Sequence, residues 1–142
     1  MEWNYYDTFI AVAADCPVER ATVPPDKKEG KTKAGIEFEL AAGHPYRYTQ
    51  EDLLYETYVR HKQIPKEELD ASGTRIRDEF FQKPMACLRA SMLPKKFGWG
   101  IHFNKEGKLA LVPMESEEYR SYVDGKRDNV KVVMAMRNSR AK

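Results

Sequence analysis

The sequence predicts an α+β fold, with a mainly antiparallel sheet of about four to five strands and helices packed on one side of it. Segments with helical periodicity gather between residues 32 and 83, whereas most segments of alternating apolar residues come later, so helices and strands are largely segregated along the chain. The 142 residues, 42% of them hydrophobic, suffice for one core. We therefore expect a single domain over residues 1–142.

The first strand is expected over residues 8–13, which are rich in β-forming side chains and are followed by Cys16 and Pro17. Residues 17–33 contain three prolines, four lysines and no apolar period. This composition is typical of a long exposed loop.

Three helices are expected next. Thr32 can cap a helix that runs to Leu40 and ends near Gly43, because glycine favours helix termini. Thr49 and the acid three residues later, Asp52, form a capping-box pattern that starts a second helix. Its apolar period ends near residue 64.

Pro65 suits the first position of the third helix, where its missing N–H group would have no partner in any case. Leu69, Ile76 and Phe80 would form the buried stripe of this helix. Gly73 lies in the same stripe, so it either lets another element approach closely or divides the helix in two. Pro84 would end the helix.

The pattern then becomes alternating. A strand over residues 85–91 would place Cys87, Arg89 and Ser91 on one face. Residues 98–104 and 108–114 would form a hairpin around the loop 104–107. In its first strand, Trp99, Ile101 and Phe103 would share one face, opposite to Gly100, His102 and Asn104.

The C-terminal part is expected to contain one more helix and one more strand. Ser116 can cap a short helix that ends at Gly125. In the last strand the inward side chains would be Val130, Val132, Met134 and Met136, with Lys131 outward. Residues 137–142 would form a basic, frayed tail.

Composition restricts the setting and the partners. The net charge is +2, so no global field attracts a polyanion, and we expect neither a nucleic-acid nor a membrane partner. The N-terminus lacks the basic-then-apolar order of a signal peptide. Cys16 and Cys87 are far apart in sequence, which favours free thiols and a cytoplasmic location, although a single disulfide stays possible.

Reactive side chains are densest between residues 84 and 103. Cys87 is a weak candidate nucleophile, activated by Arg89 with His102 as a base, but its apolar neighbours are more typical of a buried structural thiol. The three histidines come from three different segments, so we expect no metal site, and no motif indicates a cofactor or a catalytic residue.

The same region suggests a binding site. Arg89, Ser91, Lys95 and His102 could line a pocket for an anion, because charge-assisted donors favour carboxylate and phosphate groups. Trp99, which lies between two glycines, could contact a ligand there, although a tryptophan in an alternating strand is more often in the core.

We therefore favour a non-enzymatic binding or accessory module, with a small anionic ligand or a protein partner near residues 87–102. One alternative is an enzyme that depends on Cys87 or His102. The other is weak nucleic-acid binding through Lys95, Lys96 and Trp99, because basic and aromatic side chains together contact phosphates and stack on bases.

The chain also resembles a family of small bacterial proteins, labelled hypothetical cytosolic proteins and classed as a domain of unknown function. The likeness runs nearly end to end and is carried by residues 3–10, 48–54, 60–62, 87–91, 98–102, the helix start at Ser116 and residues 134–137. The resemblance implies a bacterial cytoplasmic setting and one compact domain. It implies no activity and no functional residues.

Overall fold

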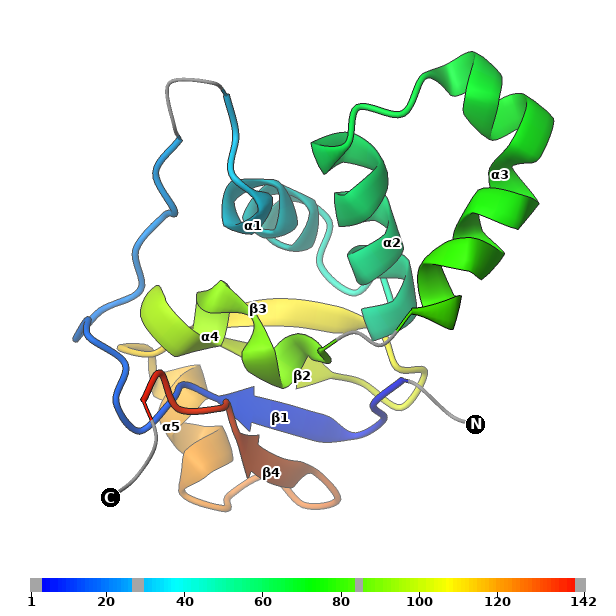
Figure 1. Ribbon diagram of the computed structural model, residues 1–142. Coiled ribbons are helices and arrows are strands. Elements are labelled where there is room, and N and C mark those ends of the chain that lie inside the picture. The colour runs from blue at the N-terminus through cyan, green and yellow to red at the C-terminus, as the bar shows by residue number, and fades with distance from the viewer. Residues whose placement is uncertain (1–3, 27–29, 84–85, 140–142) are drawn as a thin grey trace.

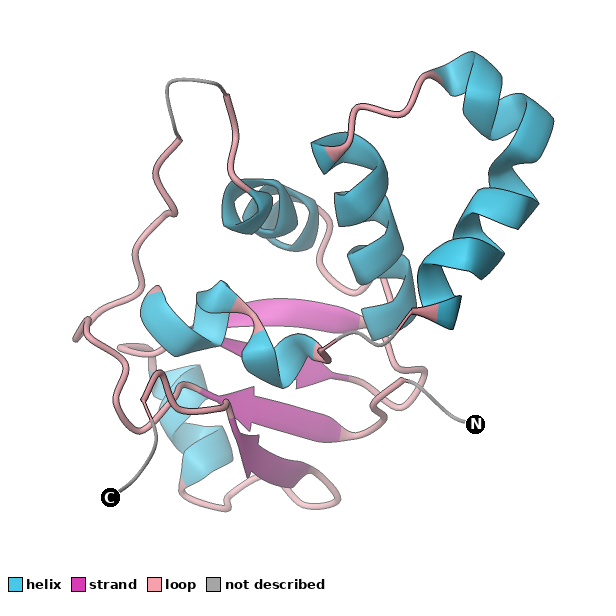
Figure 2. Ribbon diagram, viewed as in Figure 1, coloured by secondary structure: helices cyan, strands magenta, loops and turns pink. Residues whose placement is uncertain are grey.

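The computed structural model describes residues 4–26, 30–83 and 86–139 and has an α+β architecture around one sheet (Figures 1 and 2). The described part of the chain forms four strands in the order β3-β2-β1-β4. Their bounds are Thr8–Ala11 for β1, Trp99–Phe103 for β2, Leu109–Pro113 for β3 and Lys131–Met134 for β4. β1 and β3 both run antiparallel to β2, whereas β4 runs parallel to β1. The sheet is therefore mixed, and the expectation of a mainly antiparallel sheet is wrong.

Helices lie on both faces of the sheet, so the expectation of helices on one side is also wrong (Figure 1). Five α-helices and one short 3₁₀ helix, η1, occur in the described residues. Their bounds are Lys33–Gly43 for α1, Gln50–His61 for α2, Lys66–Gln82 for α3, Leu88–Ala90 for η1, Met92–Lys96 for α4 and Glu117–Val123 for α5. α1, α2, η1 and α4 lie over one face, and α5 covers the other.

The alternation of side chains along β1 explains why both faces are covered. Phe9 and Ile10 point to opposite faces, and both are fully buried. Ile10 packs with Leu40, Leu53 and other apolar side chains of the helical layer. Phe9 packs on the other face with Tyr122 of α5, and their rings stack at 4.3 Å.

The predicted helix starts are confirmed. The Thr32 side chain accepts a hydrogen bond from the Gly35 backbone N–H at 3.0 Å. Thr49 and Asp52 form the full capping box of α2, which ends at His61, slightly earlier than expected. Ser116 caps α5 by accepting from the backbone N–H of Tyr119.

The third helix begins directly after Pro65 and is divided in two. Ser72, beside Gly73, has non-helical backbone angles (φ −139°, ψ 19°). This confirms the expectation that the helix could be divided in two at Gly73. α3 leans outward from the rest of the molecule in Figure 1. Of its side chains, only Ile76 is fully buried, and it packs against Tyr55 and Val59 of α2.

The predicted strand over residues 85–91 is wrong for residues 86–91, because residues 88–90 form η1 and α4 begins directly afterwards at Met92. Pro84, the predicted end of the third helix, and Met85 lie outside the described residues. The Ser91 side chain caps α4 by accepting from the Leu93 backbone N–H at 3.1 Å. Pro94 is tolerated because it lies in the first turn of the helix, where a backbone N–H group needs no intrahelical partner.

The hairpin is confirmed, and its β2–β3 register pairs Trp99 with Pro113 and Phe103 with Leu109. Gly107 in its loop has a positive φ of 80°, a conformation that glycine adopts without steric cost. Ile101 and Phe103 face the helical layer and are fully buried, as the alternation predicted.

The predicted inward face of the last strand is wrong for Val132, Met134 and Met136, whereas Val130 packs against the core on the α5 side and Lys131 is exposed, as predicted. Val133 and Ala135 pack against the core of the helical layer, whereas Val132, Met134 and Met136 are 40–51% exposed. The period of two is correct, but it shows only which residues share a face and not which face is covered.

Hydrogen bonds attach parts of the predicted 17–33 loop and of the predicted C-terminal tail to the rest of the molecule. The Thr22 backbone N–H donates to Phe97 O at 2.8 Å. Asn138 and Ser139 donate their backbone N–H groups to the Asp15 carboxylate, and the bond from Asn138 contributes most to lowering the pKa of Asp15 to about 2. The rest of the predicted frayed tail, residues 140–142, lies outside the described residues.

Gly100 offers a test of the packing beneath α5. A methyl group added there would lie 2.5 Å from Phe9 Cζ and 3.0 Å from Tyr119 Cε2. We expect Gly100→Ala to lower the free energy of unfolding by roughly 1–3 kcal/mol because the core is overpacked. Urea denaturation followed by circular dichroism measures this.

The matched control is Gly73→Ala, since a methyl group at Gly73 meets no atom within 4 Å. Helix propensity should leave this variant as stable as the parent or up to about 1 kcal/mol more stable. Equal stability of both variants would contradict the packing described for Gly100.

Candidate functional site

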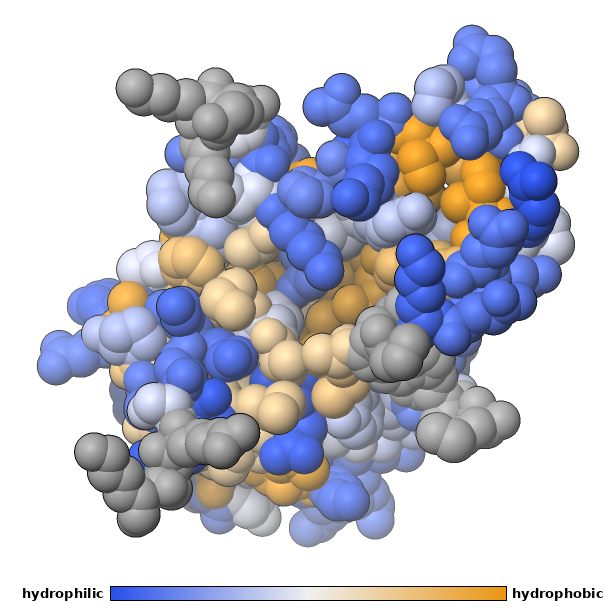
Figure 3. All heavy atoms as spheres, viewed as in Figure 1, coloured by the Kyte–Doolittle hydropathy of each residue, from blue (hydrophilic) through white to orange (hydrophobic). Residues whose placement is uncertain are grey.

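A cavity lined mainly by apolar side chains lies in the helical layer, between the first turns of α1, the adjoining parts of α2 and α3, and the segment 86–92. Its volume is about 230 Å³. Figure 3 shows hydrophobic atoms exposed in a hollow between α1 and η1, where this cavity opens. Its lining is Lys33, Ala34, Glu37, Leu54, Phe80, Ala86, Cys87, Leu88, Ala90, Ser91 and Met92. We call it the Glu37 pocket.

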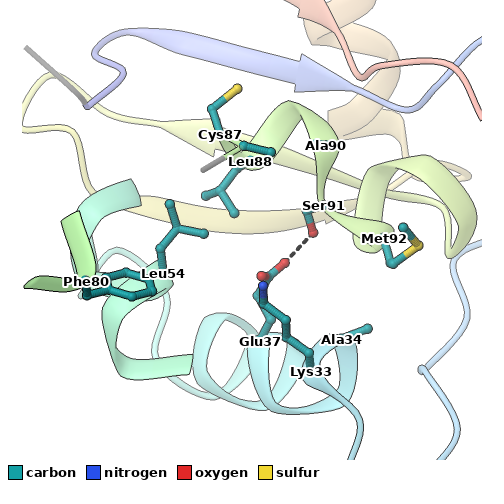
Figure 4. A pocket seen from close by; sticks show the side chains of 11 residues that line it. Lys33, Ala34, Glu37, Leu54, Phe80, Cys87, Leu88, Ala90, Ser91 and Met92 are labelled. Carbon is teal, nitrogen blue, oxygen red and sulfur yellow. Dashed lines mark hydrogen bonds between the residues drawn. The ribbon is translucent and has the colours of Figure 1, made fainter. Parts of the chain in front are cut away.

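Glu37 is the buried acid of this pocket, with only 4% of its surface exposed. The Ser91 hydroxyl donates a hydrogen bond to Glu37 Oε1 (Figure 4). Because Ser91 Oγ also accepts from the Leu93 backbone N–H, one hydroxyl both caps α4 and holds the acid of α1. Helix capping thus positions the hydrogen-bond donor of the site.

The second carboxyl oxygen of Glu37, Oε2, has no hydrogen-bond partner among the residues the structure describes. Burial raises the pKa of Glu37, while the Ser91 hydrogen bond and the positive charge of Lys33 act in the opposite direction. The pocket therefore holds a carboxyl group that is costly to ionise and has one oxygen free for a ligand.

Lys33 lies one helical turn before Glu37 and is exposed at the rim of the pocket. In Figure 4 both side chains extend from α1 toward Ser91. Within the described parts of the chain, Lys33 forms no ion pair with Glu37, although residues four apart on a helix are neighbours.

The wall formed by η1 is held by a buried side chain of α2. The Leu88 backbone N–H donates to Gln50 Oε1 at 2.7 Å, and both residues are fully buried. Next to Leu88, the Cys87 sulfur points away from Glu37 (Figure 4) and lies 3.4 Å from the Tyr5 hydroxyl. Burial, together with the Cys87 thiol, raises the pKa of Tyr5 to about 12.

His102 lies on the other face of the sheet, because it alternates with the buried Ile101 and Phe103. Its Nδ1 is 2.8 Å from the Tyr46 hydroxyl, and its ring lies 4.9 Å from that of Tyr122 in α5. Burial lowers the pKa of His102. The sheet separates this imidazole from Cys87, so the two do not form the nucleophile–base pair considered from the sequence.

The other predicted site residues are also dispersed. Arg89 Nε donates to the backbone O of Met134 at 2.7 Å, beside β4. Trp99 is half-buried; its Nε1 donates to Thr22 O at 2.7 Å, and its ring packs against Phe38. Lys95 accepts from Asn138 Nδ2 through its backbone O. Of the five predicted binding residues, only Ser91 lines the Glu37 pocket.

Sequence reasoning missed Glu37 itself. A signal was present, since Ile36, Leu40 and Ala41 form the apolar stripe of the first helix and Glu37 lies within that stripe. A charged residue on the buried face of a helix is rare unless it has a partner or a role.

The described residues contain neither a metal-binding group of side chains nor a membrane-spanning helix. No group of three or more histidine, cysteine, aspartate or glutamate side chains is placed to hold a metal ion within residues 4–26, 30–83 and 86–139. No helix in those same ranges has the length and apolar character needed to cross a membrane.

Comparison with known proteins gives one match. A family model described as "Family of unknown function (DUF6157)" matches residues 1–141. This confirms the resemblance to a family of unknown function. No curated protein and no solved structure matches the chain.

The raised pKa of Glu37 predicts a pH dependence of stability. A carboxyl group whose pKa is higher in the folded chain than its ordinary value of 4.5 contributes stability below pH 4.5, and this contribution is lost as the pH rises through the folded-state pKa. We expect the stability difference between Glu37→Gln and the parent to shift in favour of the variant from pH 4.5 upward. Urea denaturation at a series of pH values measures this difference.

Glu39→Gln is the matched control, because Glu39 is on the same helix, exposed and ion-paired with Lys31. A stability difference for Glu37→Gln that stays constant from pH 4.5 to 8 would show that burial does not raise the pKa of Glu37.

Proposed function

Since the chain belongs to DUF6157, a family of unknown function, we propose its function from the geometry of the Glu37 pocket. We propose a binding module that holds a small, largely apolar molecule with a hydrogen-bond donor directed at Glu37. The single observation that carries this proposal is the free Oε2 atom of a carboxyl group that is 4% exposed.

A buried carboxyl group is stabilised when both of its oxygens have partners. Within the described residues, the fully buried side-chain oxygens without a partner are Thr57 Oγ1 and Asn138 Oδ1, so Glu37 Oε2 is open to the pocket rather than sealed inside the protein. Ser91 satisfies only Oε1 of Glu37 within the described structure. A ligand N–H or O–H group that reaches Oε2 would complete the set, so the structure favours a ligand with a donor there.

The size and the lining of the pocket fit a molecule that contains one ring or a short branched chain. An apolar cavity of about 150 Å³ suffices to bind benzene. The Glu37 pocket, at about 230 Å³, has room for such a group together with a polar substituent. Leu54, Phe80 and Leu88 supply apolar contact surface.

This proposal keeps the binding module expected from the sequence but replaces the small anionic ligand by a largely apolar molecule with a hydrogen-bond donor. The location is partly the same, because the pocket includes Cys87 and Ser91 of the region 87–102. A simple anion is disfavoured because burial makes a negative charge costly in this pocket, as the raised pKa of Glu37 indicates. A location in the bacterial cytoplasm belongs to the same proposal; it is supported by the family resemblance and by the free thiols of Cys16 and Cys87.

The two alternatives receive less support from the geometry. For an enzyme based on Cys87, the histidine base considered from the sequence lies beyond the sheet. For nucleic-acid binding, Lys96 is exposed, but the Trp99 indole N–H is already bonded to Thr22 and the ring packs on Phe38. A non-enzymatic binding module therefore remains the proposal.

Two probes with the same aromatic body test the proposal. Benzyl alcohol carries a donor, whereas benzyl methyl ether does not. We expect benzyl alcohol to bind about tenfold more tightly, which corresponds to roughly 1.4 kcal/mol and lies within the range of about 0.5–1.5 kcal/mol for a typical hydrogen bond. Methyl NMR titration, followed at Leu54 and Leu88, measures both dissociation constants.

A variant that fills the pocket provides the control for location. Ala34→Phe places a ring in the cavity and should abolish binding, while Ala42→Phe changes an exposed position of the same helix and should not. The proposed function is refuted if neither probe binds, or if both bind to Ala34→Phe as tightly as to the parent.

A further inference from the structure

The Glu37 pocket is lined by one basic and one acidic side chain of α1, Lys33 and Glu37. Lys33 is at the rim and Glu37 is inside, and four residues of α-helix separate them by about 6 Å along the axis of α1. The described structure contains no ion pair between them. Because Lys33 is exposed and Glu37 is buried, a ligand in the pocket can contact a basic group on its solvent side and an acidic group on its protein side.

Lys33 is not the only group at the rim of the pocket that attracts a negative charge. Lys33 and Ala34 are the first two residues of α1, where the backbone N–H groups lack intrahelical acceptors. The cap residue Thr32 accepts from the next two N–H groups, through its side chain from Gly35 and through its backbone O from Ile36. The N-terminus of the helix and the Lys33 ammonium thus both favour a carboxylate at the rim.

The acidic end is Glu37: burial raises its pKa, but an ammonium group beside the free Oε2 atom would favour the ionised form of the carboxyl group. An ammonium group needs an acceptor, and the Ser91 oxygen already accepts from the Leu93 backbone N–H. Glu37 is thus the main polar partner available inside the pocket.

We propose that the ligand is a zwitterion of the α-amino-acid type with an apolar side chain. Its carboxylate would lie at the first turn of α1 beside Lys33, and its ammonium group would donate to Glu37 Oε2. Its side chain would pack against Leu54, Phe80 and Met92. This inference rests on the proposed function, for which it names the ligand class.

Singly charged ligands fit this arrangement less well. A simple amine would satisfy Glu37 but would leave Lys33 and the helix N-terminus facing a positive charge. A simple carboxylate would satisfy Lys33 but would place a second negative group beside Glu37. A zwitterion has no net charge, and each of its charged groups meets a group of opposite sign.

Three probes that share a phenylethyl body test this inference by isothermal titration calorimetry. They are L-phenylalanine, 2-phenylethylamine, which lacks the carboxylate, and 3-phenylpropionate, which lacks the ammonium group. We expect L-phenylalanine to bind at least tenfold more tightly than either of the others. Equal or tighter binding of 2-phenylethylamine or of 3-phenylpropionate would overturn the inference.

Two variants assign the charges. Lys33→Met should weaken the binding of L-phenylalanine about tenfold and leave that of 2-phenylethylamine unchanged or stronger. Glu37→Gln should weaken the binding of both ammonium-bearing probes. Lys66→Met, at the exposed start of α3, and Glu39→Gln, at an exposed position of α1, are the charge-matched controls and should change neither.

The results separate this inference from the proposed function. If benzyl alcohol binds in the pocket but L-phenylalanine does not, the pocket is a binding site and the zwitterion inference is wrong. If no probe binds, both fail. If L-phenylalanine binds equally well to Lys33→Met and Glu37→Gln, its charges are not recognised by these side chains, and the inference is again wrong.

Discussion

Burial of the sheet on both faces is the constraint on which the rest of the structure depends. Phe9 and Ile10 are adjacent in β1 and are both fully buried, which requires an apolar layer on either side. The hairpin continues this division, since Ile101 packs on the helical side and His102 lies on the side of α5. Polar groups on opposite faces therefore cannot cooperate, and any site must be built within one layer.

Within the helical layer, the contact between Glu37 and Ser91 connects secondary structure with the pocket. Ser91 caps α4 and at the same time donates to the acid of α1. The buried polar contact between Gln50 and Leu88 similarly attaches η1 to α2. Two polar contacts thus fix the walls of a cavity that is otherwise lined mainly by apolar side chains. Such satisfied polar contacts favour one arrangement of the surrounding elements over others.

Local signals made much of the fold predictable. Caps such as Thr32 and Thr49 act through hydrogen bonds to the next turn of the chain, so their effect is visible in a few residues of sequence. The segment 85–91 could not be assigned in this way. Its alternation resembles a strand, but the cap at Ser91 and the burial of Leu88 by α2 favour helical turns.

Long-range features were not predictable, because they depend on which elements meet. The parallel pairing of β4 with β1 and the position of α5 decide which side of the last strand is inward. The site could not be predicted for the same reason. Ser91 was singled out by its own neighbourhood, whereas Glu37, Leu54 and Phe80 reach the same cavity from three other helices. The acid within the apolar stripe of the first helix was the only local sign of it.

The sequence suggested Arg89 as a ligand-binding residue, but in the structure Arg89 contacts the edge of the sheet. β4 is the outermost strand on its side of the sheet, and such strands expose backbone groups that can recruit a strand from another molecule. The Arg89 guanidinium occupies the Met134 carbonyl, and the Arg89 carbonyl accepts the Met136 N–H. Val132 and Met134 are exposed on the same strand and would favour such pairing. By occupying two backbone groups of this edge, Arg89 leaves fewer of them free and so disfavours edge-to-edge self-association.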